Sequence, residues 1–119
     1  MTEVTASDTQ DVFAEAEALM CLDGDRALLR ALLRLFVELS PLLLGDVSLA
    51  QSRGDAEKLV RLARRLEASA AQICAYRVAT AAREVAAVAA RDGAAACSPA
   101  IGRVASELAQ LLARIGTAD

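Results

Sequence analysis

The sequence predicts an all-α protein: an antiparallel four-helix bundle with a short additional N-terminal helix. Hydrophobic residues make up 55% of the 119 residues, whereas aromatic residues make up only 3%. A core of this composition must be aliphatic and rich in alanine, which suits closely packed helices better than a β-sandwich or barrel. Four long stretches also repeat their apolar residues at helical spacing, and short loops separate them.

The N-terminal part is predicted to contain a tail and a short helix. We expect residues 1–8 to form a disordered tail and residues 9–117 to form one domain, as is usual for a chain of this length. A short helix is predicted near 9–20, where Asp8 or Thr9 can act as the N-cap.

The longest predicted helix spans about 26–52, with Asp25 as its N-cap. Its first apolar residues are Leu28, Leu29, Leu32, Leu35, Phe36 and Leu39. Pro41 has no backbone N–H to donate, so it must either kink the helix or restart it. A kinked, nearly continuous helix is favoured, because the apolar pattern continues through Leu43 and Val47.

Three more helices are predicted. One spans 55–73 with Asp55 as its N-cap, and the next spans about 75–91. The last begins at Ser98, where a serine cap precedes a proline in the first helical position, and it closes at Gly116.

The helix over 55–73 is strongly two-sided. With Leu66 at zero and about 100° per residue, the residues on its side are Leu59, Leu62, Ala63, Ser69, Ala70 and Ile73. Arg64 falls on the opposite side. This helix therefore buries one face and displays Arg64 at the middle of the other.

This region resembles the histidine phosphotransfer (HPt) domain. The family pattern is a helix carrying His-x-Leu-Lys-Gly-Ser, then small residues, then Gly-Ala and a second helix. The matching scaffold residues are Leu66, Ser69, Ala70, Ile73, Ala75, Val78 and Val85. The segment LDGDRALLRALLRLFVELSP is similar to the second helix of HPt domains, so the resemblance covers the chain from about residue 12 onward.

The positions that carry HPt chemistry differ. Arg64 stands where the family has its phospho-accepting histidine, and the chain has no histidine. A guanidinium stays protonated and has no free lone pair to attack phosphorus, so the protein is not expected to be an enzyme. Glu67 replaces the family's lysine and would repel phosphate. Ala68 and Cys74 replace its two glycines.

The resemblance implies a pseudo-HPt protein in two-component phosphorelay signalling. It would bind a response-regulator receiver domain or a histidine kinase without carrying phosphate. The residues expected to contact the partner are Arg61, Arg64, Arg65, Glu67, Ala68 and Ala71. The alternative interpretation is that Arg64 is an ordinary solvent-exposed arginine without a binding role. A Glu57–Arg61 ion pair would then neutralise part of the positive charge around it. The alternative function is a helical assembly or adaptor module whose alanine-rich faces make a homodimer or bind an unrelated protein.

Composition excludes several other classes. A net charge of −3 argues against nucleic acid as a partner, and no uncharged apolar run is long enough for a membrane span. The polar, acidic N-terminus is not a secretory signal, so a cytoplasmic protein is expected. No cofactor or metal is expected, since the three cysteines are widely spaced and should be buried or half-buried free thiols. Ser69 is expected to be a core hydroxyl bonded to the preceding turn.

Overall fold

The computed structural model describes residues 15–118, and the described chain is helical throughout apart from its short connections. In chain order the elements are α2 (Glu15–Cys21), α3 (Arg26–Ser52), α4 (Ala56–Gln72), α5 (Tyr76–Asp92), the 3-10 helix η1 (Ala94–Cys97) and α6 (Ser98–Ala118). The predicted all-α class is confirmed. The predicted tail over 1–8 and the first part of the helix near 9–20 lie outside the described residues.

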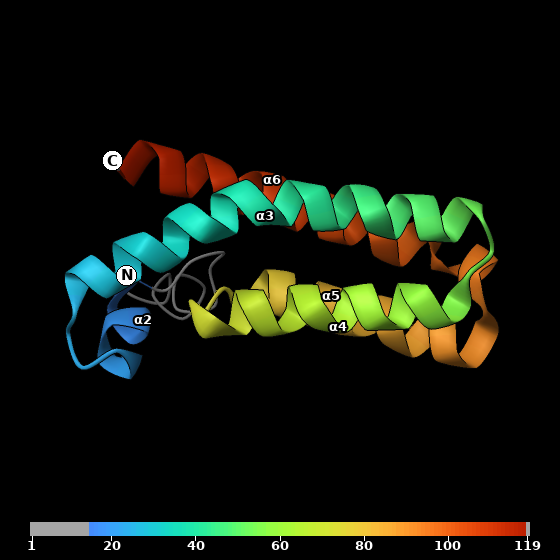
Figure 1. The fold of residues 1–119 in the computed structure, drawn as a ribbon, viewed down its shortest axis with the longest axis horizontal. Helices are drawn as coiled ribbons and strands as arrows, with labels where there is room; N and C mark the ends of the chain where they lie inside the picture. Colours follow the sequence, from blue (N-terminus) through green and yellow to red (C-terminus); the bar gives the residue numbers. More distant parts are fainter. Residues whose placement is uncertain (1–14, 119) are drawn as a thin grey trace, which may run out of the picture.

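The four long helices pack along one another in a helical bundle, and α2 lies at one end of it (Figure 1). The closest pair is α4 with α5, which the three residues 73–75 connect. Helix α3 packs on α4, and α6 packs on α5 and α3. None of the helices in the described part has the length and apolarity that crossing a bilayer requires.

Two aspartates begin the helices as the sequence predicts. The backbone N–H of Leu28 donates to Asp25 Oδ1 at 3.0 Å, and that of Lys58 donates to Asp55 Oδ1 at 3.1 Å. Each carboxylate satisfies an N–H that has no partner within its helix and places negative charge at the positive end of the helix dipole.

Helix α3 is continuous through Pro41, as expected. Figure 1 shows that this helix bends between its N-terminal and C-terminal halves. A bend is the expected consequence of a proline inside a helix, because its ring pushes against the carbonyl of the preceding turn. Ser40, the residue before the proline, is buried, and its hydroxyl oxygen has no hydrogen-bond partner among the described residues.

Helix α6 departs from its predicted ends. Ser98 has helical backbone angles, φ −52° and ψ −48°, so it is not a serine N-cap. The chain enters α6 directly from η1, and the Ser98 hydroxyl accepts a hydrogen bond from Gln51 Nε2 at 2.8 Å instead. At its other end α6 continues through Gly116 to Ala118.

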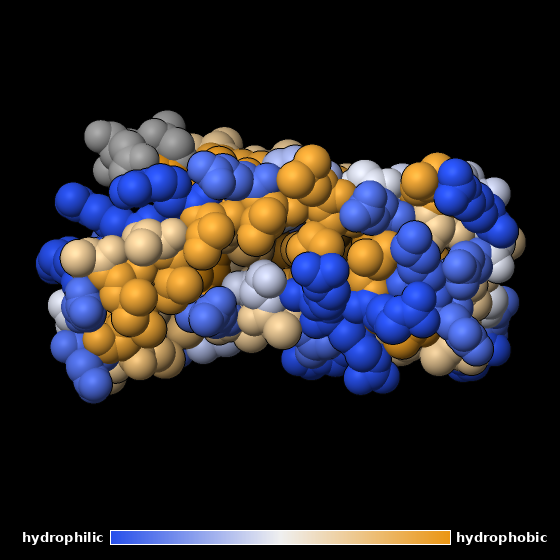
Figure 2. Space-filling model, in the orientation of Figure 1, coloured by the Kyte–Doolittle hydropathy of each residue, from blue (hydrophilic) through white to orange (hydrophobic). Residues whose placement is uncertain are grey.

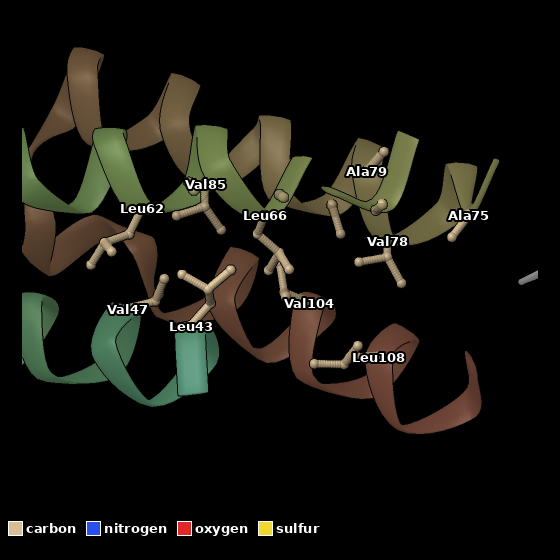
Figure 3. Packing of buried hydrophobic residues seen from close by; sticks show 14 of the residues in the cluster. Leu43, Val47, Leu62, Leu66, Ala75, Val78, Ala79, Val85, Val104 and Leu108 are labelled. Carbon is tan, nitrogen blue, oxygen red and sulfur yellow. The ribbon is translucent and has the colours of Figure 1, made fainter. Parts of the chain in front are cut away.

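The core lies where α3, α4, α5 and α6 face one another. Leu66, Ile73, Val78 and Val85 are all at most 1% exposed, so the predicted helix phases are confirmed. Figure 3 shows valine and leucine side chains from all four helices converging there. The alanines buried around α4 and α5 are Ala63, Ala70, Ala75, Ala79, Ala81, Ala82, Ala86 and Ala89. These small side chains let the two backbones approach closely, as the composition indicates.

The prediction for the apolar side of α3 is only partly right. Leu29 and Phe36 are buried, but Leu28, Leu35 and Leu39 are exposed. The apolar residues of α3 cover a wider arc than the bundle can bury, so only the central part of that arc faces the core.

Candidate functional site

Most of the residues predicted to contact a partner are exposed on the outer face of α4. Arg61, Arg64, Arg65, Ala68 and Ala71 are exposed. Their exposure follows from the opposite side of the helix, where Leu59, Leu62 and Leu66 fill the core. Glu67 lies at the edge of this face and is half-buried.

Four cationic side chains gather on the first three turns of α4. Lys58, Arg61, Arg64 and Arg65 border a shallow depression whose floor is Leu62. Figure 2 shows hydrophilic residues over this part of α4. Among the ion pairs of the described residues, none involves Arg61, Arg64 or Arg65, and the Glu57–Arg61 pair of the alternative interpretation is not formed. Within the described residues, no ion pair therefore offsets the positive charge of these three arginines, although the net charge of the protein is −3.

Glu67 is neutralised by a residue that the sequence analysis missed. Its Oε2 accepts a hydrogen bond from Arg83 Nε of α5 at 2.8 Å. Glu67 is therefore not a free negative charge on this face. No local spacing indicates the pair, because the partners are 16 residues apart and meet only through the packing of α4 on α5.

A shallow apolar groove lies beside the cations, between the N-terminal part of α4 and the C-terminal part of α5. Its lining residues are Ala56, Glu57, Val60, Arg61, Ala89 and Ala90. The small side chains form a flat floor, while Glu57 and Arg61 supply charge at the rim. A flat apolar floor with a charged rim is typical of protein–protein contact surfaces.

The turn between α4 and α5 carries a strained residue. Cys74 has φ +57°, in the left-handed region that favours glycine. The Ala75 N–H donates to the Ala70 carbonyl at 2.8 Å and the Cys74 N–H to the Ala71 carbonyl at 3.0 Å, which is the Schellman arrangement. Cys74 aligns with a glycine of the HPt pattern. The turn therefore has a left-handed residue at this position, but a cysteine occupies it instead of the glycine that would suit this conformation best.

The thiols of Cys21 and Cys74 meet at this end of the molecule, with 3.8 Å between their Sγ atoms. The Tyr76 hydroxyl also contacts Cys74 Sγ, at 3.2 Å. Hydrogen bonding with Cys74 raises the pKa of Cys21 above its ordinary value and that of Tyr76 to about 12. The cysteines are free, as predicted, but Cys21 is exposed rather than buried, because the short helix α2 leaves it at the surface.

Ser69 does not behave as predicted. Its side chain is half-buried and no hydrogen bond to the preceding turn is formed. Instead it lines a groove between α3 and α4, together with Leu35 and Leu39. The helix phase places it at the margin of the core and not inside it.

In the described part of the chain, no three histidine, cysteine, aspartate or glutamate side chains are grouped as metal ligands. No family model, curated protein or solved structure matches this chain.

Proposed function

We propose that this protein is a pseudo-HPt protein that binds a receiver domain or a histidine kinase of a two-component phosphorelay and carries no phosphate. Its four long helices would form an HPt-like antiparallel four-helix bundle. Short connections support this topology, since residues 53–55, 73–75 and 93–97 are all that separate successive long helices.

The observation that carries the proposal is the position of Arg64. It is exposed near the middle of the outer face of α4, two residues before the buried Leu66, as the histidine of the family pattern stands relative to its leucine. A guanidinium cannot take up a phosphoryl group, but it can form charge-assisted hydrogen bonds with carboxylates or with a phosphoaspartate. In this proposal the face corresponds in position to the phosphotransfer site of HPt domains, but it binds a partner and does not transfer phosphate.

The surroundings of Arg64 suit an acidic partner. Arg61 and Arg65 form no ion pair with any described residue and add positive charge, while the Glu67–Arg83 ion pair offsets the negative charge that would oppose it. Exposed rim charges act mainly on the rate of encounter, and the small flat floor limits the affinity. A dissociation constant in the range of about 1–100 µM is therefore expected.

The test uses Ala68, which is exposed one turn after Arg64. Ala68→Glu should abolish binding of labelled receiver domains and kinases encoded near this gene, because it places an unpaired charge in the contact. Ala109→Glu, at an exposed alanine of α6, is the matched control and should bind like the wild type. Equal affinity for wild type and Ala68→Glu would contradict the proposal.

The alternative function, an assembly module, depends on exposed alanine-rich faces. Most of those alanines pack between α4 and α5 and are buried, so they are not free for a partner. The exposed apolar residues that remain to be explained are leucines of α3.

A further inference from the structure

Two thiols from distant parts of the sequence meet at the end of the bundle where α2 lies (Figure 1). Cys21 is the last residue of α2, and Cys74 lies 53 residues later in the turn between α4 and α5, with 3.8 Å between the Sγ atoms. A disulfide bond is about 2.05 Å long, so the two sulfurs must approach by roughly 1.8 Å to form one. The third cysteine does not share this contact, because Cys97 Sγ donates to the backbone carbonyls of Val85 and Gly93.

The two thiols differ in exposure, and this difference sets the order in which they can react. Cys21 is exposed, whereas Cys74 is only 2% exposed. A reagent in solution therefore reaches the sulfur of Cys21, and Cys74 can react only with a sulfur that is already beside it. An exposed thiol in contact with a second thiol is the arrangement in which one cysteine forms a mixed disulfide and the other resolves it.

The backbone at Cys74 carries a steric cost that the turn itself does not require. Its φ of +57° suits glycine better than cysteine. The hydrogen bonds of this turn come from backbone groups, so a glycine would form them equally well. A strained position that persists is a reason to look for a function of its side chain. Here that side chain is a thiol in contact with Cys21 Sγ and with the hydroxyl of Tyr76.

A bond between these thiols would fasten α2, the least firmly held helix of the described chain. It is seven residues long, and Ala18 is the buried residue among those that the structure describes in it. A short helix with so little buried surface opens more easily than the long helices. It is followed by a turn in which Asp23 and Gly24 have positive φ. A small shift of α2 with a rotation of the Cys21 side chain can therefore bring the sulfurs to bonding distance.

We propose that Cys21 and Cys74 form a reversible disulfide by exchange with a low-molecular-weight disulfide, for which oxidised glutathione is the probe, and that this bond holds α2 against the α4–α5 turn. The Cys21 thiolate attacks one glutathione sulfur, an S–S bond forms, and the other glutathione leaves as a thiolate that takes up a proton. Cys74 then gives up its proton and attacks Cys21 Sγ, and the second glutathione leaves in the same way. Two protein thiols are oxidised, and one glutathione disulfide is reduced to two glutathione molecules.

The reverse reaction begins at the same exposed sulfur. A small thiol attacks Cys21 Sγ, and Cys74 leaves as a thiolate beside the Tyr76 hydroxyl, which donates to its Sγ at 3.2 Å. A hydrogen bond to the departing sulfur stabilises its negative charge, so reduction should be easy. The thiols lie at the C-terminal end of α4, whereas the cations of the proposed docking face lie on its first three turns. The inference therefore does not depend on the proposed function.

Mass spectrometry of the full chain after incubation with oxidised glutathione at about pH 8 tests the bond. The three cysteines lie in three different tryptic peptides, 1–26, 66–77 and 92–103, so each pairing has its own mass. The wild type should lose two hydrogen atoms, keep no glutathione and give a link between peptides 1–26 and 66–77. Cys97→Ala is the matched control and should give the same link. A lasting glutathione adduct on the wild type, a link through Cys97 or a disulfide between two copies overturns the proposal.

Two variants test the order of the steps. Cys74→Gly, which suits the left-handed turn, should keep one glutathione on Cys21, because no second thiol displaces it. Cys21→Ser should take up glutathione about tenfold more slowly or not at all, because the remaining thiol of this pair is buried. Equal uptake by the two variants would overturn the assignment of Cys21 as the thiol that reacts first.

The state of α2 tests the consequence of the bond. Oxidation should raise the melting temperature by about 5 °C or more, because the disulfide closes a long loop in the unfolded chain. Hydrogen exchange of the α2 amides should slow about tenfold, and dithiothreitol should reverse both changes without denaturant. Tyr76→Phe should slow this reduction several-fold, and an unchanged rate would remove Tyr76 from the step. A disulfide that leaves α2 exchange unaltered overturns the proposal that it holds this helix.

Discussion

Arg83 Nε lies 2.8 Å from Glu67 Oε2, which joins α5 to α4 at the edge of the face that displays Arg64. The arginine side chain is 66% exposed and the glutamate side chain 25%. Solvent screens such a pair, so its contribution to folding is expected to be less than about 1 kcal/mol. Its effect on the charge of the face is larger, because it decides whether Glu67 opposes an acidic partner.

The first prediction follows from this ion pair. Arg83→Ala should leave the free energy of unfolding nearly unchanged but weaken binding of a receiver domain several-fold, because it leaves the Glu67 carboxylate uncompensated beside Arg64. The loss should shrink as salt concentration rises. Arg91→Ala is the control, since in the described part of the chain Arg91 forms its ion pair with its exposed neighbour Asp92 and not with Glu67. Identical affinities for the two variants in a fluorescence titration would exclude this role of Arg83.

Local sequence signals predicted most of the fold. Helical periodicity placed Leu66 and Val85 in the core, and Asp25 and Asp55 begin their helices as capping rules require. The helix near 9–20 is described only from Glu15.

What could not be predicted depends on contacts between distant segments. The partner of Glu67 is set by the packing of α4 on α5, and the Ser98 hydroxyl bonds to Gln51, 47 residues away. The exposure of Leu35 depends on how much of α3 its neighbours cover. Periodicity shows where apolar residues lie on a helix, but it does not show which part of a wide apolar arc the rest of the protein buries.

The second prediction concerns the core. Leu66→Ala should lower the free energy of unfolding by about 2–5 kcal/mol, because it removes a side chain that is 1% exposed and leaves a cavity among the helices. Urea denaturation followed by circular dichroism measures the change. Val37→Ala, at an exposed residue of α3, should change stability by less than about 1 kcal/mol. A small effect of Leu66→Ala would contradict the helix phase on which the position of Arg64 depends.

The third prediction concerns the strained turn at Cys74. Cys74→Gly and Cys74→Ala both remove the buried thiol, so their difference isolates the cost of a left-handed backbone. The glycine variant should be more stable by about 1 kcal/mol, because its φ of +57° carries no steric penalty for glycine. Inside an ordinary helix the order would be reversed, with alanine more stable by about 1 kcal/mol. Thermal denaturation of the two variants shows which order holds, and greater stability of the alanine variant would rule out strain at this turn.

The fourth prediction concerns thiol reactivity and pH. The hydrogen bond with Cys74 raises the pKa of Cys21, so at neutral pH less of this exposed thiol is in the reactive thiolate form. Its alkylation by iodoacetamide should be slow at neutral pH and continue to accelerate as pH rises past the range in which ordinary thiols level off. Cys74→Gly removes the main cause and should speed the reaction at pH near 8. Mass spectrometry of timed samples measures both rates, and equal rates would show that Cys74 does not influence Cys21.

Cys97 provides an internal comparison in the same experiment. Burial raises its pKa, and the side chain is inaccessible between η1 and α5. It should be labelled only when the protein unfolds, whatever residue stands at position 74. Labelling of Cys97 at the rate of Cys21 in native protein would show that this part of the core opens.

The last prediction restores the missing chemistry. Arg64→His supplies an exposed imidazole, whose unprotonated nitrogen can attack a phosphoaspartate and take over the phosphoryl group as the aspartate oxygen leaves. We expect this change alone to be insufficient, because Glu67 stands where the HPt pattern has a lysine that helps to hold phosphate, and its ion pair with Arg83 keeps that arginine from binding the phosphoryl group. Adding Glu67→Lys replaces that charge and also frees Arg83 to bind phosphate, so the double variant places two more cations where negative charge develops.

Transfer from a phosphorylated receiver should therefore give an acid-labile phosphate on the double variant and none on wild type or Arg64→His. The rate should increase as pH rises through about 6.5, where imidazole loses its proton. Arg61→His combined with Glu67→Lys is the matched control, because Arg61 lies on the same face one turn earlier and does not hold the position of the family's histidine. Equal labelling of both double variants would mean that position 64 has no special relation to a docked receiver. Stoichiometric acid-labile phosphate on the wild type would refute the pseudo-HPt assignment itself.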